Sequence, residues 1–139
     1  MIEKWHSCVE FNIPSSCYEL LSICEDINGL KIIFCDEIRH IKITYSTQYL
    51  AYRCCDEADR WKRISEVLFE NGNDYFKKNL VSIVENSELK KWFMSETSFC
   101  YKDQQVQHHS FVTRNDVIDV LAVGFPLVEV ESCFCKHEN

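Results

Sequence analysis

Cysteine and histidine residues near the C-terminus have the types that a zinc site requires. Cys133, Cys135 and His137 form a C-x-C-x-H run, and thiolates and imidazoles are good zinc ligands. This spacing, however, places neighbouring ligands on opposite sides of an extended chain, and no fourth ligand is evident. We therefore expect no metal site and no bound cofactor in this chain.

A second arrangement has the residue types of nucleophilic catalysis. Cys100 precedes the pair His108-His109, and a thiol beside an imidazole base is the arrangement of a cysteine-dependent enzyme. No family-specific signature surrounds Cys100. We instead expect a strand with one imidazole inward and hydrogen-bonded and the other outward. Of the adjacent cysteines, Cys54 is expected to pack inward and Cys55 to lie at the strand exit, with a redox switch as the alternative.

Other motifs for catalysis and cofactor binding are missing from the sequence. The three glycines are isolated, so the sequence contains neither a dinucleotide-binding nor a phosphate-binding glycine motif. The nine cysteines include no C-x-x-C pair, which predicts reduced thiols used as small apolar residues. The N-terminus lacks a signal-peptide pattern, and no apolar stretch reaches the roughly 18 residues that cross a bilayer. These features predict a cytoplasmic protein.

Carboxylates gather at three predicted helix starts and form the candidate partner-binding set. The set comprises Asp56, Glu57, Asp59, Glu85, Glu88, Asp116 and Asp119. The net charge of -7 argues against nucleic acid or an anionic membrane as a partner and favours a basic protein, which a negative patch would steer and select. Tyr49 or Trp92 would then serve as an aromatic anchor. The alternative interpretation is a solvated surface with ordinary helix capping.

Hydrophobic periodicity predicts the elements that position these residues. The segment from Ile38 to Asp59 shows two alternating runs followed by carboxylates, which predicts a β-hairpin that leads into a helix start. Further strands are predicted at 4–13, 30–35, 80–84, 106–113 and 127–130. Helices are predicted at 15–26, from 61 to a stop at Gly72, at 87–93 with a serine cap, and at 117–121. A short amphipathic turn is predicted around Tyr75.

These elements predict an α+β fold with a mostly antiparallel sheet of about five to six strands, packed with helices as a single pair of layers. The length of 139 residues is that of one domain, and 46% hydrophobic residues suffice for a core. We expect one domain over residues 1–132 and a loose tail over 133–139.

Three segments give the chain a resemblance to a known class of proteins. The segments are NSELKKWFMSET, TRNDVIDVLAVGFP and AYRCCDEADRWKRI. In these segments, and in size, acidity and layout, the chain resembles small bacterial immunity proteins of polymorphic and contact-dependent toxin systems. The resemblance implies a non-catalytic inhibitor that covers the active site of a basic nuclease toxin, and it carries over no functional residue.

The sequence thus favours a non-catalytic protein-binding module, an immunity protein that neutralises a basic toxin domain through an acidic face. Two alternatives stay open at this point. One is a small-ligand-binding or regulatory domain whose aromatic sheet face holds an apolar molecule. The other is the cysteine-dependent enzyme that would use Cys100 with His108 or His109.

Overall fold

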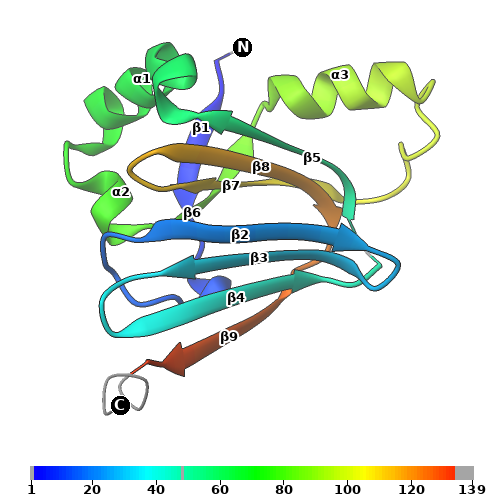
Figure 1. The fold of residues 1–139 in the computed structure, drawn as a ribbon. Helices are drawn as coiled ribbons and strands as arrows, with labels where there is room; N and C mark the ends of the chain where they lie inside the picture. Colours follow the sequence, from blue (N-terminus) through cyan, green and yellow to red (C-terminus); the bar gives the residue numbers. More distant parts are fainter. Residues whose placement is uncertain (1, 48, 134–139) are drawn as a thin grey trace.

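Two antiparallel sheets packed face to face form the body of the protein in a computed structural model, which describes residues 2–47 and 49–133. One sheet has the order β1–β6–β7–β8–β5 and the other the order β2–β3–β4–β9 (Figure 1). The strands are β1 (Lys4–Ser7), β2 (Glu19–Asp26), β3 (Gly29–Cys35), β4 (Arg39–Tyr45), β5 (Tyr49–Asp56), β6 (Val81–Glu85), β7 (Val106–Val112), β8 (Asp116–Val123) and β9 (Leu127–Ser132).

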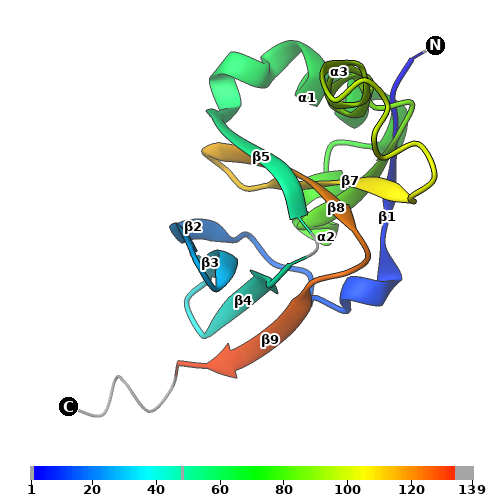
Figure 2. The ribbon, with the colours of Figure 1, turned by 90° about the vertical axis from the view of Figure 1, so that its right-hand side faces the viewer.

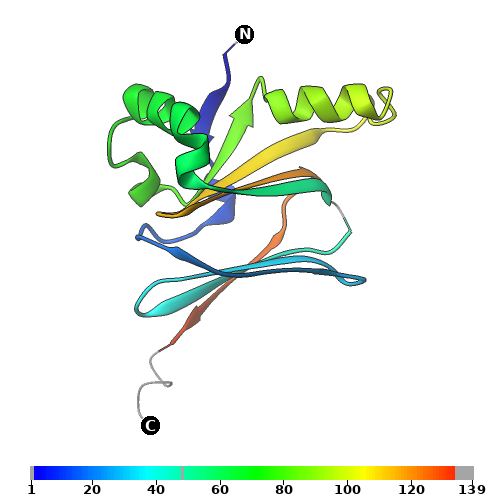
Figure 3. The same cartoon turned by 45° about the horizontal axis from the view of Figure 1, so that its top comes forward.

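The helices lie outside this sandwich. They are α1 (Trp61–Asn71), α2 (Tyr75–Lys78) and α3 (Glu88–Glu96), with short 3-10 turns η1 (Val9–Phe11) and η2 (Glu57–Arg60). Helices α1 and α3 cover the outer face of the five-stranded sheet, and the four-stranded sheet lies against its other face (Figures 2 and 3). The main core therefore fills the space between the sheets, where Ile32, Ile43 and Phe111 are fully buried.

The predicted fold class is wrong. The described residues hold nine strands in two sheets rather than one sheet of five to six strands. Two predicted helices are strands in the structure. One of them, β2, belongs to the four-stranded sheet, and the other, β8, belongs to the five-stranded sheet. The fold is an antiparallel β-sandwich with helices on one outer face.

The helix predicted over residues 15–26 is wrong because a β-bulge imitates helical spacing. In β2, Leu20 lies opposite Phe34 and Ile23 lies opposite Ile32, with a register shift between them. One extra residue in a bulge changes the phase of side-chain alternation. Leu20 and Ile23 consequently both face the core at a spacing of three residues, which the sequence presents as one side of a helix.

The helix predicted over residues 117–121 is β8, a strand buried on both faces. Val117 packs against the cluster that includes residues of α1, whereas Ile118 belongs to the core between the sheets. A strand covered on both sides loses the alternation of apolar and polar residues. Its continuous apolar run therefore also satisfies the three- and four-residue spacing of a helix.

The hairpin predicted from Ile38 to Asp59 is also wrong, although both of its strands exist. Strand β4 pairs with β3 and β9, and β5 pairs with β8. The connection between β4 and β5 therefore passes from one sheet to the other (Figure 2). Each strand alternates as predicted, but alternation identifies a half-buried strand without identifying its partner.

Several local predictions are confirmed. Strand β3 occupies the predicted segment. Helix α1 ends at Gly72, whose φ of 104° is a backbone angle that glycine adopts more readily than other residues. Ser87 caps α3 by accepting a hydrogen bond from the Lys90 amide. The strand predicted at 4–13 ends at Ser7 and is followed by η1.

The described chain ends at Cys133, which is buried and donates its backbone amide to the Ile38 carbonyl. The rest of the tail predicted over 133–139 lies outside the described residues. Among the helices that the structure describes, none has the length and apolar character needed to span a membrane.

Candidate functional site

A polar seam crosses the outer face of the five-stranded sheet between helices α1 and α3. In the sheet register Asp119 of β8 lies opposite Arg53 of β5, and His108 of β7 lies one diagonal step from Asp119. Such neighbours on one sheet face are within side-chain contact. One apolar cluster under α1 contains Val117, and another under α3 contains Leu121. Between these two clusters the outer face of the sheet carries polar side chains, and these form the seam.

Hydrogen bonds link three buried side chains of this seam. Ser87 Oγ lies 2.7 Å from His108 Nδ1, and His108 Nε2 lies 2.7 Å from Asp119 Oδ1. Because the Asp119 carboxylate can only accept, the network assigns the imidazole proton to Nε2. Nδ1 shares the second hydrogen bond with the Ser87 hydroxyl, whose oxygen also accepts from the Lys90 amide at 2.9 Å. We call Ser87, His108 and Asp119 the buried relay.

Two arginines complete the surroundings of Asp119. Arg53 Nε and Arg60 Nη1 donate to its Oδ2 at 2.8 Å and 2.7 Å. Burial alone would raise the pKa of Asp119, but the hydrogen bond and charge of His108 and the charges of Arg60 and Arg53 outweigh it. The pKa of Asp119 is therefore held well below its ordinary value, and the carboxylate stays charged in the interior.

The buried relay has the residue types of a hydrolase triad but lacks two requirements of one. The Ser87 side chain is only 3% exposed, and its oxygen accepts the helix-capping bond from Lys90. The neighbouring Glu88 amide, which would face a developing oxyanion, instead donates to Glu3 Oε2 at 2.8 Å. With the hydroxyl and this amide both engaged, the arrangement joins α3 to the sheet and serves stability.

A groove of about 690 Å³ opens between η2, α1 and α3 beside the relay. Its lining includes Arg53 and Arg60 together with the exposed indole of Trp92 of α3. A third arginine, Arg63, also lines it. Helices α1 and α3 stand apart on the sheet, as Figure 3 shows. The groove thus combines cationic donors with aromatic surface.

Arg63 is engaged by three carboxylates. Its Nε lies 3.1 Å from Glu3 Oε1, its Nη2 lies 3.2 Å from Glu88 Oε2, and its Nη1 lies 3.9 Å from Glu66 Oε1. Two of these contacts are within 3.2 Å, and the third is a longer ion pair beyond hydrogen-bond distance. This cluster connects the N-terminal segment to both α1 and α3.

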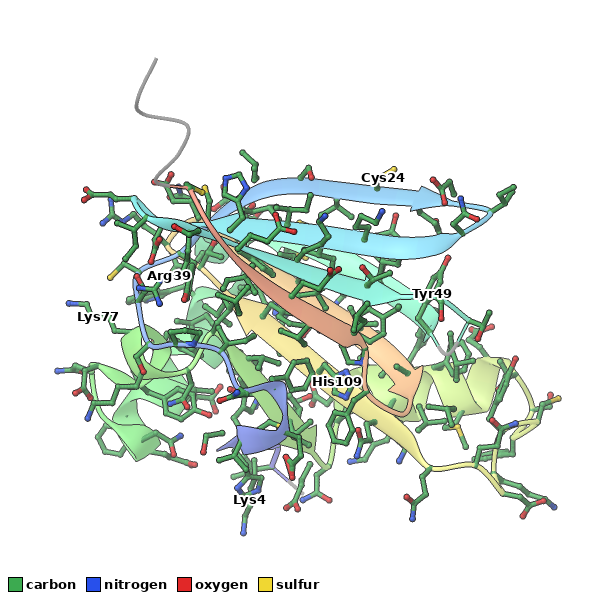
Figure 4. All side chains as sticks on the ribbon, turned by 90° about the horizontal axis from the view of Figure 1, so that it is seen from below. Lys4, Cys24, Arg39, Tyr49, Lys77 and His109 are labelled. Atoms are coloured by element: carbon green, nitrogen blue, oxygen red, sulfur yellow. The ribbon has the colours of Figure 1, made fainter. Side chains whose placement is uncertain are left out.

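His109 lies on the opposite face of β7, in the core between the sheets (Figure 4). Its Nδ1 lies 2.7 Å from the Tyr45 hydroxyl, and its Nε2 lies 3.0 Å from Gln107 Oε1. Burial lowers the pKa of His109 to about 4, and the charge of His108 contributes further. The prediction of one inward and one outward imidazole is therefore wrong, because helices also cover the outer face and both rings are buried.

Four of the seven predicted partner-binding acids lie at one end of the five-stranded sheet, where β5 enters η2. Asp56 lies opposite Asp116 in the β5–β8 register, and Glu57 and Asp59 follow in η2. The Glu57 amide donates to the Asn115 carbonyl at 2.9 Å, which joins η2 to the turn between β7 and β8. We call Asp56, Glu57, Asp59 and Asp116 the acidic end.

The other three predicted acids lie elsewhere. Glu85 pairs with His6 on the β1–β6 edge, and Glu88 pairs with Arg63. Asp119 is fully buried, so its predicted outward position is wrong. The reason is that residues 117–121 form a central strand covered by helices. Burying a carboxylate there costs free energy, which its hydrogen-bond partners offset.

The predicted catalytic and metal candidates are not brought together. Cys100 is exposed after α3, while His108 and His109 are engaged with other partners. Among described residues no three histidine, cysteine or acidic side chains are arranged to hold a metal ion. Of the C-x-C-x-H run, only Cys133 is described.

Sequence reasoning missed Arg53 and Arg60 and gave Ser87 only a capping role. A signal for the seam was present, because Asp119 interrupts the apolar run from Val117 to Val123. A carboxylate inside a buried strand requires cationic or donor partners from elsewhere in the chain. No protein family, curated protein or solved structure matches the chain.

Proposed function

We propose that this protein is a non-catalytic protein-binding module, an immunity protein that neutralises a basic bacterial toxin domain. The observation that carries the proposal is the acidic end. Asp56 and Asp116 face each other on neighbouring antiparallel strands, where like charges destabilise a sheet. Asp56 caps η2 by accepting from the Ala58 amide at 2.9 Å, whereas the Asp116 carboxylate has no hydrogen bond or ion pair among the described residues. Recognition of a cationic partner would explain why a second carboxylate stands opposite the cap.

The surroundings of the acidic end suit a protein interface. Trp61 follows η2 directly and is 59% exposed, although its helical spacing predicts an inward side chain. Exposed tryptophans beside charged residues are typical energetic anchors of protein interfaces. The net charge of -7 would accelerate the encounter with a basic protein and orient it.

The proposed setting is the bacterial cytoplasm. The eight described cysteines are all free, and free thiols persist where glutathione and thioredoxin keep proteins reduced. An inhibitor of a nuclease toxin is needed in that same compartment, where the toxin would meet nucleic acid. A role without catalysis agrees with the engaged serine and imidazole of the buried relay.

The proposal is tested by expressing the chain together with the polypeptide encoded beside it in the genome. If that neighbour is a toxin, we expect the chain to restore growth and to form a stable complex with the toxin domain on size-exclusion chromatography. A variant with Asp56→Asn and Asp116→Asn should protect less well at matched expression. A neighbour that is harmless, or toxic but neither bound nor neutralised, would refute the proposal.

A control variant separates charge at the acidic end from total charge. Glu37→Gln with Glu129→Gln removes the same number of charges from exposed positions next to β4 and on β9. Glu129 belongs to the other sheet, and Glu37 lies in the connection between its strands β3 and β4. We expect this control to protect cells as the native chain does. Equal loss of protection in both variants would assign the effect to net charge rather than to the acidic end.

A further inference from the structure

We propose that the groove between η2, α1 and α3 is a binding site for a small molecule that carries a carboxylate or phosphate on a flat ring. Arg53 and Arg60 would hold the anionic group, and Trp92 would stack on the ring. This site shares Asp59 with the acidic end but would bind an anion rather than a cation, and it does not depend on the proposed function.

The two arginines retain unused hydrogen-bond donors. Among the described residues, Arg53 makes one side-chain hydrogen bond, from Nε to Asp119, and Arg60 makes one, from Nη1 to the same oxygen. Arg63, in contrast, has two short contacts to Glu3 and Glu88 and a longer ion pair with Glu66 at 3.9 Å. A guanidinium can donate in a fork to a single oxyanion. Arg53 and Arg60 therefore have donors left for a ligand in the groove that both of them line.

The charges around Asp119 also favour an incoming anion. Its single carboxylate meets two guanidinium groups, and it is fully buried. One positive charge is therefore left uncompensated by this carboxylate, on side chains that reach the groove. Charge-assisted hydrogen bonds from arginine to a carboxylate or phosphate are among the stronger polar contacts in proteins.

The aromatic side of the groove fits a planar body. Trp92 is 56% exposed, so the surface of its indole is open to solvent beside the groove that it lines. The volume of about 690 Å³ lies within the range of roughly 300 to 1,000 Å³ that small-ligand sites occupy. An apolar wall beside two cationic donors matches the make-up of such sites.

One carboxylate in the groove opposes an anion and provides an internal test. Glu3, Glu66 and Glu88 line the groove but are paired with Arg63. Asp59 lines it too, and it has no hydrogen bond or ion pair among the described residues. Replacing Asp59 by asparagine should therefore tighten the binding of an anion. The same change should weaken a basic protein partner, so the two proposals fail or succeed independently.

The probes are 2-naphthoate, 2-naphthyl phosphate and the uncharged 2-naphthamide, titrated against the full chain by calorimetry and by quenching of tryptophan fluorescence. We expect saturable binding of at least one anionic probe and at least roughly tenfold weaker binding of the amide, as lost charge-assisted hydrogen bonds imply. Binding of the phosphate alone would identify a phosphorylated ligand class, and binding of the carboxylate alone would identify a carboxylic acid.

Variants then assign the binding to the named residues. Arg53→Gln and Trp92→Ala should each weaken the anionic probe roughly tenfold or more. Trp61→Ala removes an equally exposed indole that does not line the groove and should leave binding unchanged. Arg53→Gln leaves Asp119 with two partners, and Trp92→Ala leaves the ion pairs intact. The proposal is overturned if no anion saturates, if the amide binds as well, or if Trp92→Ala behaves like Trp61→Ala.

Discussion

Acid should destabilise this protein mainly through one buried histidine. His109 is fully buried, and its folded-state pKa is about 4 compared with an ordinary value of 6.5. Between these two values the unfolded chain binds a proton that the folded chain does not bind. The free energy of unfolding is therefore complete above pH 6.5, decreases as the pH falls, and stops decreasing from this source near pH 4.

The size of the effect follows from the pKa difference. Each pKa unit corresponds to 1.36 kcal/mol, so the shift from 6.5 to about 4 amounts to about 3 kcal/mol. That is a large part of the roughly 5–15 kcal/mol by which domains of this size are stable. Asp119 contributes outside this window, because its lowered pKa supports stability that is lost only below the ordinary carboxyl value of 3.8.

The substitution His109→Gln tests this reasoning. The amide oxygen of glutamine can accept from the Tyr45 hydroxyl and its NH₂ group can donate to Gln107, which replaces both hydrogen bonds without a titrating group. Urea denaturation from pH 7.5 to pH 4 should show a loss of about 3 kcal/mol in the native chain and little loss in the variant. His6→Gln, at a half-exposed site, should keep the native profile.

Acid sensitivity of the same size in His109→Gln would refute this assignment. The slope of stability against pH is compared, rather than stability at one pH, because glutamine changes packing in the core. His109 lies between the rings of Tyr45 and Phe125 at centroid distances of 5.8 Å. An amide fills that space differently, and this affects all pH values alike.

Four further substitutions test the fold by denaturation. Gly29→Ala should cost more than about 1 kcal/mol, because φ is 114° and a Cβ would lie 2.1 Å from the Tyr45 carbonyl oxygen. Gly124→Ala, where a Cβ meets nothing within 4 Å, should cost less; equal costs would contradict the steric argument. Asp119→Ala should cost about 3–5 kcal/mol by leaving buried charged partners unpaired. Asp116→Asn should raise stability by a few tenths to about 1 kcal/mol by removing a like-charge pair. A loss of stability would contradict the inference that Asp56 and Asp116 destabilise the folded protein.

Local features were predictable from sequence where one interaction determines them. Ser87 caps its helix because a serine before a helix can accept from a first-turn amide. Gly72 ends α1 because few other residues adopt its backbone angles. Strand β3 was evident from its β-branched and aromatic residues. These predictions depend only on neighbours in the chain.

The errors arise where distant parts of the chain decide the outcome. The bulge in β2 gives Leu20 and Ile23 helical spacing on a strand. Strand β8 lost its alternation because a sheet covers one face and helices cover the other. The pairing partners of β4 and β5 depend on which sheet each joins, and alternation contains no information on that choice.

The candidate site could be predicted only in part for the same reason. The sequence indicated the group of acids in η2 and at the start of β8, which the register then brings together. It did not indicate that Asp119 belongs to a buried network, because its partners Arg53, Arg60 and His108 come from three other elements. Only the sheet register makes those residues neighbours.

The association rate with the proposed toxin partner, measured at several salt concentrations, tests the central claim most directly. At low salt the Asp56→Asn, Asp116→Asn variant should bind several-fold more slowly than the native chain, and the two rates should converge as salt screens the charges. Identical association rates at every salt concentration would contradict the account, because the acidic end would then take no part in recognising the partner.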